Sequence, residues 1–366
     1  MVARINYWFD TGNARLKMRS ELPVSVDVVV IGGGIAGLST IYHLLSHGVN
    51  AILLDKTDIG YHASGRSNGV VGFPSLLNVA GFDDAFYAVR LNNRLLRNII
   101  KKETLACDFN YTGELQVAID NSKLPPLKHD SILNLNRDDL SQIVPTQAFS
   151  HGVYLPVTNT LNMYQLLYGL CGICELTGQR LFGHVDVLQI TKNQKGLMIH
   201  TSGKHKPIVC KQAVVCSNNF MYLFESGLNN VLCSVPVSAA CTKPMADFPF
   251  LHMPIKILDS DIYLSFYNNR IFVDYSGDYD LSKLPLKSYF KQFGGYDFEY
   301  FWQGHVYHTP DHYPLVGRID DNIFINTGHG RSGLSYAILG GKIISDCITN
   351  QTTNIKQASL FSPHRF

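Results

Sequence analysis

The chain has 366 residues, a length that gives a prior of two domains at about 150 residues each. Charged residues make up 16% of the chain, against roughly 25% in a typical soluble domain, and hydrophobic residues make up 46%. This composition excludes a disordered chain, and the formal net charge of +2 gives no electrostatic basis for binding nucleic acid. No uninterrupted apolar run approaches the roughly 18 residues of a membrane-spanning helix. We therefore expect a large, soluble protein whose apolar interior can hold a buried organic cofactor.

Eight cysteines are spread along the chain, and the only close pair is Cys171 and Cys174, within a segment of helical apolar spacing. A zinc or redox site would need a second ligand pair at matching spacing, and the sequence has none. We interpret these cysteines as buried, reduced thiols and predict no metal. The N-terminal residues are polar and lack the apolar core of a secretory signal, so we expect a cytoplasmic protein.

The first predicted elements form a parallel strand–helix–strand unit. Residues 28–31 are a continuous apolar run, typical of a strand buried on both faces. Apolar residues then recur at helical spacing from Ile35 to Leu45, and His47-Gly48 provides a helix end. Residues 51–54 form a second short apolar strand.

The later elements divide into two kinds. Helices are predicted over 82–102, 162–176 and 334–348, and strands over 115–119, 185–190, 197–201, 213–216 and 323–326. Strands at 263–266 and 270–275 flank Asn268-Asn269, a sequence typical of a hairpin turn. Strands and helices typical of a nucleotide-binding domain thus occur at the beginning, middle and end of the chain. This order predicts a discontinuous nucleotide-binding domain over 24–80, 156–222 and 301–366, a second domain over 81–155 and 223–300, and an N-terminal extension over 1–23.

A dinucleotide-binding loop lies between the first strand and the first helix. Its sequence, Gly32-Gly33-Gly34-Ile35-Ala36-Gly37, has the form G-x-G-x-x-G. Gly32 permits a tight turn, Gly34 lets the backbone approach a pyrophosphate, and Gly37 lets the helix pack close to the strand. Asp55 follows the second strand, where a carboxylate can hold ribose hydroxyls. The loop predicts an adenine dinucleotide and leaves NAD and FAD open.

Several further motifs resemble those of the D-amino-acid oxidase-like superfamily of FAD enzymes. That group includes glycine oxidase, sarcosine oxidase, D-amino-acid dehydrogenases and gamma-glutamylputrescine-type amine oxidases. The N-terminal Tyr7-Trp8 followed by Asp10-Thr11 resembles the leader of the last branch. The other matching segments are DIGYHASGRSNGVVG at 58–72, Thr309-Pro310-Asp311, Pro314-Leu315-Val316-Gly317, Asn326-Thr327-Gly328-His329-Gly330 and the ending at 361–366.

This resemblance implies an α/β fold with a Rossmann-like FAD-binding domain of the glutathione-reductase type and a discontinuous antiparallel-sheet substrate domain. Val185 would contact adenine by its backbone, and the loop from Gly328 to Gly333 would lie against the pyrimidine end of the flavin. The residues implied to bind FAD are Gly32, Gly34, Ile35, Ala36, Gly37, Asp55, Lys56, His62, Ala63, Ser64, Gly65, Arg66, Ser67, Asn68, Val185, Gly328, Gly330, Arg331, Ser332, Gly333 and Leu334.

The resemblance leaves two forms of flavin attachment. Sarcosine oxidase-like members use a cysteine in the segment around Trp302, and Gly304 stands at that position, so we expect non-covalent FAD. Alternatively, Tyr61-His62-Ala63 resembles the segment of dimethylglycine dehydrogenase-like enzymes in which the histidine carries the flavin. A covalent link at His62 therefore stays open.

The activity implied is oxidation of an amine or amino acid at its C–N bond, by hydride transfer to flavin N5 and hydrolysis of the resulting imine. Val306 stands where glycine oxidase-like members carry an arginine that binds the substrate carboxylate, which leaves Arg331 as the candidate anchor. His305 and His308 are candidates for lowering the pKa of the substrate amine. The candidate catalytic residues are Arg331, His305, Tyr307, His308 and Tyr263, with Tyr267 as a further candidate for lining the cleft.

A second hypothesis is a flavoprotein subunit that needs a partner subunit for activity. Ser217-Asn218-Asn219 departs from the small Ala-Gly turn that the family usually carries after the strand at 213–216. The sequence leaves open the substrate, the electron acceptor and the oligomeric state.

Overall fold

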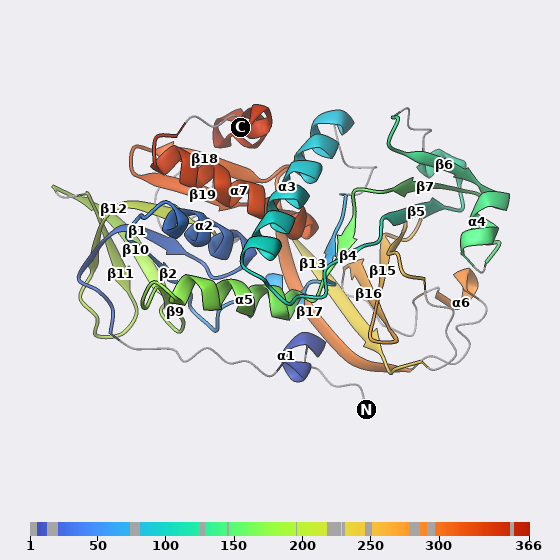
Figure 1. Cartoon of the computed structure of the whole chain (residues 1–366), viewed down its shortest axis with the longest axis horizontal. Coiled ribbons are helices and arrows are strands. Elements are labelled where there is room, and N and C mark those ends of the chain that lie inside the picture. The colour runs from blue at the N-terminus through green and yellow to red at the C-terminus, as the bar shows by residue number, and fades with distance from the viewer. Residues whose placement is uncertain are drawn as a thin grey trace.

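The computed structural model describes residues 6–12, 21–73, 81–124, 129–144, 146–194, 196–217, 228, 231–245, 251–277, 284, 286–290, 297–351 and 355–366. Two large β-sheets and a set of long helices make up most of this mixed α/β fold (Figure 1). The turn predicted at Asn218-Asn219 lies outside the described residues. Within the described parts of the chain, no helix is long and apolar enough to cross a membrane.

The first sheet contains the predicted strand–helix–strand unit. Its parallel strands are ordered β9-β2-β1-β12-β19, with β11 antiparallel to the start of β12, β10 beyond β11, and β18 antiparallel to β19. The strands are β1 (Ser25–Ile31), β2 (Ala51–Leu54), β9 (Leu181–Phe182), β10 (Val187–Asn193), β11 (Gly196–Thr201), β12 (Ile208–Val215), β18 (Leu315–Asp320) and β19 (Ile323–Thr327).

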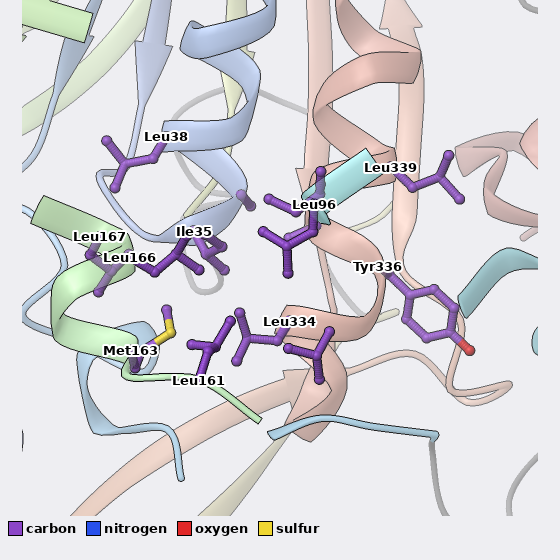
Figure 2. Close-up of a cluster of buried hydrophobic side chains, with 14 of the residues drawn as sticks. Ile35, Leu38, Leu96, Leu161, Met163, Leu166, Leu167, Leu334, Tyr336 and Leu339 are labelled. Atoms are coloured by element: carbon purple, nitrogen blue, oxygen red, sulfur yellow. The ribbon is translucent and has the colours of Figure 1, made fainter. Parts of the chain in front are cut away.

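Four helices pack around this sheet: α2 (Ile35–Ser46), α3 (Phe82–Lys102), α5 (Met163–Glu175) and α7 (Gly333–Ile348). Figure 2 shows their apolar side chains meeting in one cluster. Successive residues of β1 point to opposite faces, so Val28 and Val30 pack in the helical cluster while Val29 lies in the core on the other side. Helices α2 and α7 cross at Gly341, where an added Cβ would lie 2.3 Å from Ser39 Oγ.

The second sheet is ordered β17-β13-β16-β15-β14-β5-β7-β6, and every neighbouring pair is antiparallel except β14 with β5. The predicted hairpin is confirmed, because Asn268 and Asn269 have φ of 49° and 57° between β15 and β16. The strands are β5 (Glu114–Ala118), β6 (Leu133–Asn136), β7 (His151–Leu155), β13 (Cys233–Thr242), β14 (Ile255–Ile257), β15 (Ile262–Tyr267), β16 (Arg270–Ser276) and β17 (Phe298–His308).

Smaller elements complete the fold. A third sheet joins β3 (Val70–Val71), β8 (Asn159–Thr160) and β4 (Asn110–Tyr111). Two short helices, α4 (Arg137–Ile143) and α6 (Leu286–Tyr289), pack by Leu140 and Leu286 against the apolar core of the second sheet. Cys171 and Cys174 are buried in α5, as predicted, and burial raises the pKa of Cys174 to about 12.

Three sequence-based boundaries need correction. Val185 precedes β10 instead of lying in a strand, and its N–H donates to Asp55 O at 2.8 Å. The predicted domain change at residue 301 cuts through β17, which pairs along its length with β13, so the second sheet extends to His308. Helix α3, expected in the second domain, packs on α7, and Asn92 Nδ2 donates to Leu334 O at 2.8 Å.

The N-terminal residues, predicted as an extension, also pack against the second sheet. Helix α1 (Tyr7–Thr11) buries Tyr7 and Trp8, and the Trp8 ring stacks on Phe272 of β16 at 5.1 Å between centroids. Tyr300 Oη on β17 donates to Asp10 Oδ2 at 2.8 Å. A polar, charged segment surrounding a few aromatic residues gave no periodic signal from which this packing could be predicted.

Candidate active site

A cavity of about 790 Å³ is lined by residues of both large sheets and of the loops between them. This volume lies within the range of roughly 300–1,000 Å³ typical of ligand sites. One end is formed by the dinucleotide loop and Asp55, and other parts by β13, β17 and the loop from His329 to Ser335.

The dinucleotide loop turns tightly from β1 into α2. Gly32 has φ of +106°, and its N–H donates to Leu54 O at 2.8 Å. An added Cβ at position 37 would lie 1.8 Å from Gly32 O, so the helix can pack this closely only on a glycine. The N–H groups of Gly33 and Ile35 donate to Asp55 Oδ2 (2.6 Å) and Ser64 Oγ (2.9 Å), which places polar side chains at the start of α2.

The loop from Ser64 to Asn68 is held from outside through three consecutive carbonyl groups. Asn6 Nδ2 donates to Gly65 O at 2.6 Å, and Trp8 Nε1 donates to Ser67 O at 2.7 Å. Trp302 Nε1 of β17 donates to the carbonyl oxygen between them, that of Arg66, at 3.0 Å. Helix α1 and the second sheet therefore fix the shape of this side of the cavity.

Four charged side chains form a set of ion pairs in the cavity, which we call the charged quartet: Lys256, Asp261, Asp274 and Arg331. Arg331 donates to Asp261 Oδ2 at 2.9 Å and to Asp274 Oδ1 at 2.6 Å, and it also donates to Ser276 Oγ at 3.0 Å. Lys256 Nζ pairs with Asp261 Oδ1.

The quartet shifts the pKa of its members. The Lys256 side chain is only 8% exposed, and burial together with Arg331 lowers its pKa to about 8. Burial opposes ionisation of Asp261, but Arg331 and Lys256 outweigh it and lower the pKa of that carboxyl.

A buried carboxyl group lies beside the quartet. Glu114 accepts from Tyr263 Oη at 2.6 Å, from Thr158 Oγ1 at 2.9 Å and from Gln116 Nε2 at 2.6 Å. Burial raises the pKa of Glu114 despite these donors. The Tyr263 ring lines the cavity, and Lys256 Nζ lies 5.8 Å from its centroid.

Histidines gather at another part of the cavity. The rings of His308 and His312 stack with centroids 4.6 Å apart, and His305 Nδ1 lies 3.1 Å from Ser234 Oγ. His329 is buried, which lowers its pKa to about 4, and its Nε2 lies 3.0 Å from Asn326 Oδ1. Because a carbonyl oxygen can only accept, this contact assigns the proton to Nε2 and leaves His329 Nδ1 as an acceptor.

Comparison with known proteins identifies the architecture. Residues 27–347 match the DAO family, described as FAD dependent oxidoreductase. The chain belongs to this family. Probable oxidoreductase OrdL from Haemophilus influenzae is 22% identical over 383 aligned residues, covering 94% of this chain and 88% of that protein. Gamma-glutamylputrescine oxidoreductase from Escherichia coli is 23% identical, with 89% of this chain and 84% of that protein aligned.

The solved structures agree on the fold. Glycine oxidase from Geobacillus kaustophilus superposes with a TM-score of 0.79 at 17% identity, over 94% of this chain and 100% of that chain. The mixed α/β fold is thus shared, and the resemblance noted in the sequence is confirmed at the level of family and cofactor. Membership of this family makes the protein an FAD-dependent enzyme.

The cavity of this oxidoreductase fits a dinucleotide. Gly34 lines the cavity, and glycine is required there because an added Cβ would lie 2.9 Å from Ser64 Oγ. Among the described residues of the cavity lining, two buried polar atoms have no hydrogen-bond partner, Ser217 Oγ and His329 Nδ1. A bound polar cofactor would supply partners for such atoms, which would otherwise be costly to bury.

Most of the residues predicted for the site line this one cavity. Three predicted glycines do not: Gly37, Gly65 and Gly328 instead allow close packing behind the lining, where an added Cβ would lie 1.8–2.8 Å from a neighbouring atom. The lining members of the prediction are Gly32, Gly34, Ile35, Ala36, Asp55, Lys56, His62, Ala63, Ser64, Arg66, Ser67, Asn68, Val185, Tyr263, His305, Tyr307, His308, Gly330, Arg331, Ser332, Gly333 and Leu334.

Two residues predicted for the substrate site have contacts that differ from those expected. Tyr267 does not line the cavity; its Oη donates to Asp108 Oδ2 at 2.6 Å. Arg331, proposed as a carboxylate anchor, does line the cavity, but its guanidinium is already engaged by two aspartates of the protein.

The other three members of the charged quartet were missed from the sequence. Lys256, Asp261 and Asp274 come from β14, the turn after it and β16, and their chain separation from Arg331 hides the pairing. One available signal was a lysine between two isoleucines, Ile255 and Ile257, in an otherwise apolar strand.

Proposed function

We propose that this oxidoreductase oxidises a C–N bond of an amine or amino acid, a small-molecule substrate that binds in the cavity. The observation that supports it most is that the dinucleotide loop and the charged quartet line the same cavity. Two proteins with similar sequence or fold are named for an amine and an amino acid, gamma-glutamylputrescine and glycine. Bound FAD would take a hydride from the carbon beside the substrate nitrogen, leaving an imine that water hydrolyses.

In this proposal, different elements of the structure bind different parts of FAD. The dinucleotide loop and Asp55 hold the adenosine and pyrophosphate half, and the loop from Ser64 to Asn68 holds the flavin half. The loop from Gly330 to Leu334 lies at the N-terminus of α7, whose dipole favours negative charge. The parallel order β9-β2-β1-β12-β19 supports a glutathione-reductase type of nucleotide domain.

The cavity residues outside the nucleotide loop would orient the substrate. We infer that His305, Tyr307 and His308 contact it, because all three line the cavity from β17. The substrate nitrogen must lose its proton before oxidation, and an uncharged imidazole can accept a hydrogen bond from it. His329 meets this requirement, since burial holds its pKa at about 4.

A second candidate is a flavoprotein subunit that acts only with a partner subunit. One observation favours it: β17, which lines the cavity, lies at the edge of the described part of the second sheet. Among the described strands it pairs with β13, and beyond that pairing the described residues give it one isolated bridge, from His308 to His329. Such an edge offers unpaired backbone groups to another chain.

An anaerobic mixing experiment separates the two candidates. The purified protein with FAD is mixed with D-amino acids, N-methyl amino acids, monoamines and polyamines, and the flavin absorbance is followed. Bleaching by any of these compounds supports the enzyme. A flavin that dithionite reduces but that no compound bleaches contradicts autonomous oxidation and favours a partner-dependent subunit.

A further inference from the structure

The charged quartet is electrically balanced within itself. Its two cations, Lys256 and Arg331, face two carboxylates, Asp261 and Asp274, so the formal charges cancel. Buried Glu114 lies beyond them, and burial favours its neutral form. An anionic substrate would therefore find no net positive charge here.

Arg331 is poorly placed to bind a substrate carboxylate. Its Asp274 bond is 2.6 Å long and its Asp261 bond is 2.9 Å long, distances typical of strong charge-assisted pairs. An incoming carboxylate that used the remaining N–H groups of Arg331 would lie close to both aspartates. Like charges at such separations repel strongly in a partly buried site.

Asp274 offers a position that can bind a cation instead of an anion. Its Oδ1 accepts from Arg331, whereas no described side chain donates to its Oδ2. The Asp274 side chain is 16% exposed and lines the cavity, so this oxygen belongs to a carboxylate that a small cation can reach. An ammonium group bound there would gain a charge-assisted hydrogen bond.

The quartet also contains a group that can give up a proton when a cation binds. Lys256 is almost fully buried, and its amine is held by Asp261. An ammonium group bound at Asp274 would favour loss of the Lys256 proton. The quartet would then carry one net negative charge. The charged and titratable groups that surround Lys256 come from β5, the turn between β14 and β15, β15, β16 and the Gly330–Ser332 turn. They are Glu114, Asp261, Tyr263, Asp274 and Arg331.

We propose that Asp274 is a specificity-determining residue that binds a positively charged group of the substrate, and that Arg331 positions the two aspartates instead of binding a substrate carboxylate. The substrate class is then an amine with a second cationic group away from the C–N bond that is oxidised. This inference rests on the proposed oxidation of amines or amino acids, and it assigns the substrate class of the same cavity.

The test compares amines that differ only in the distal charge. Putrescine and N-methylputrescine each carry a second amino group, whereas butylamine and N-methylbutylamine have the same carbon chain without it. Stopped-flow reduction of the FAD-bound protein gives an apparent Kd and a limiting rate for each. We expect the diamine of each pair to bind about tenfold or more tightly than its monoamine, with the difference mainly in Kd.

One substitution tests Asp274 directly, and a second serves as its control. Asp274→Asn should remove most of the diamine preference while changing monoamine binding little. Asp297→Asn is the matched control, because Asp297 is 74% exposed and pairs only with Lys243 at the surface among the described residues. The control should keep the full preference.

A third variant keeps the inference testable if Asp274→Asn fails to fold. In the unchanged protein, the diamine-to-monoamine ratio of affinities should rise between pH 7 and pH 9, as the quartet loses the Lys256 proton. Lys256→Met should show a high ratio at both pH values. Because the two ammonium groups of a diamine repel, its first proton leaves at a lower pH than that of the monoamine. Each affinity is therefore divided by the fraction of that compound with one uncharged nitrogen before the ratio is taken.

The outcomes separate this inference from the function on which it rests. If glycine, N-methylglycine or D-alanine reduces the flavin while the diamines show no preference, the inference is wrong and the proposed oxidation stands. Equal loss of monoamine and diamine binding in Asp274→Asn also overturns it. If no compound reduces the flavin, the proposed function fails, and the inference fails with it.

Discussion

The indole N–H of Trp8 donates to the carbonyl oxygen of Ser67 at 2.7 Å, across 59 residues of sequence. This bond ties the short N-terminal helix to the Ser64–Asn68 loop, which lines the cavity. With the bond from Asn6 to Gly65, it means that α1 supports this loop although none of the helix residues lines the cavity.

We therefore expect Trp8 to affect both folding and FAD binding. Trp8→Ala removes a buried ring and should lower the free energy of unfolding by about 3–5 kcal/mol. Trp8→Phe keeps much of the stacking on Phe272 but loses the donor to Ser67, and should lower it by about 1 kcal/mol. Urea unfolding measures the stability, and fluorescence titration of FAD into the apoprotein measures the affinity.

The matched control for Trp8 is Tyr87→Ala, at an aromatic residue of α3 that is 51% exposed. Its stability should change by no more than about 0.5 kcal/mol, and its FAD affinity should not change. An unaltered FAD affinity in a folded Trp8→Ala protein would show that α1 does not support the loop.

A second prediction concerns the glycine behind the dinucleotide loop. Gly37→Ala should yield protein without bound FAD, because its Cβ would lie 1.8 Å from Gly32 O and would force α2 away from the turn. Gly172→Ala, in α5, is the control, since an added Cβ there meets no atom within 4 Å and alanine favours a helix by roughly 0.5–1 kcal/mol. The ratio of flavin to protein absorbance after purification distinguishes them; equal ratios would contradict the account of the loop.

A third prediction follows from histidines buried in their neutral form. Burial lowers the pKa of His43 to about 3 and that of His329 to about 4, below the value near 6.5 of an unfolded histidine. Between these values the unfolded chain binds more protons, so the free energy of unfolding falls as pH decreases below about 6.5. At pH 5 each histidine accounts for a loss of about 2 kcal/mol.

Replacing His43 tests this linkage away from the cavity. His43 Nε2 is buried and has no hydrogen-bond partner among the described residues, so His43→Leu removes the titrating group without breaking a described bond of that atom. The decline in unfolding free energy from pH 7 to pH 5, measured by urea unfolding, should be smaller in the variant. An identical decline would mean that His43 is not the group that binds the proton.

A fourth prediction concerns how the flavin is held. We expect trichloroacetic acid precipitation to release all of the yellow colour into the supernatant, because FAD binds without a covalent bond. Colour that remains with the pellet, and that His62→Ala abolishes, would instead establish a covalent link at His62. His62 lines the cavity, so both results are structurally compatible with its position.

Several helices and strands could be predicted because the residues that determine them lie close together in the sequence. The apolar run of β1, the glycine loop and the spacing within α2 define the first unit, and α3 has the predicted bounds, 82–102. The paired asparagines in the left-handed region likewise determine the hairpin of β15 and β16.

Features that depend on tertiary pairing could not be predicted in the same way. Arg331 was identified as a site residue, but its partners Asp261 and Asp274 lie 70 and 57 residues away in the chain. No periodicity links such positions, and only the folded sheet brings them together. The same holds for β17, whose long pairing with β13 extends the second sheet beyond the expected boundary.

The central claim, FAD-dependent oxidation of a C–N bond, is tested most directly by a single-turnover stoichiometry. The FAD-bound protein is mixed anaerobically with an amine or amino acid that bleaches its flavin, and the carbonyl product is trapped and counted. We predict one carbonyl per flavin reduced, with release of the corresponding amine or ammonia. Flavin reduction without a carbonyl product, or no reduction of a flavin that dithionite reduces, would contradict the claim.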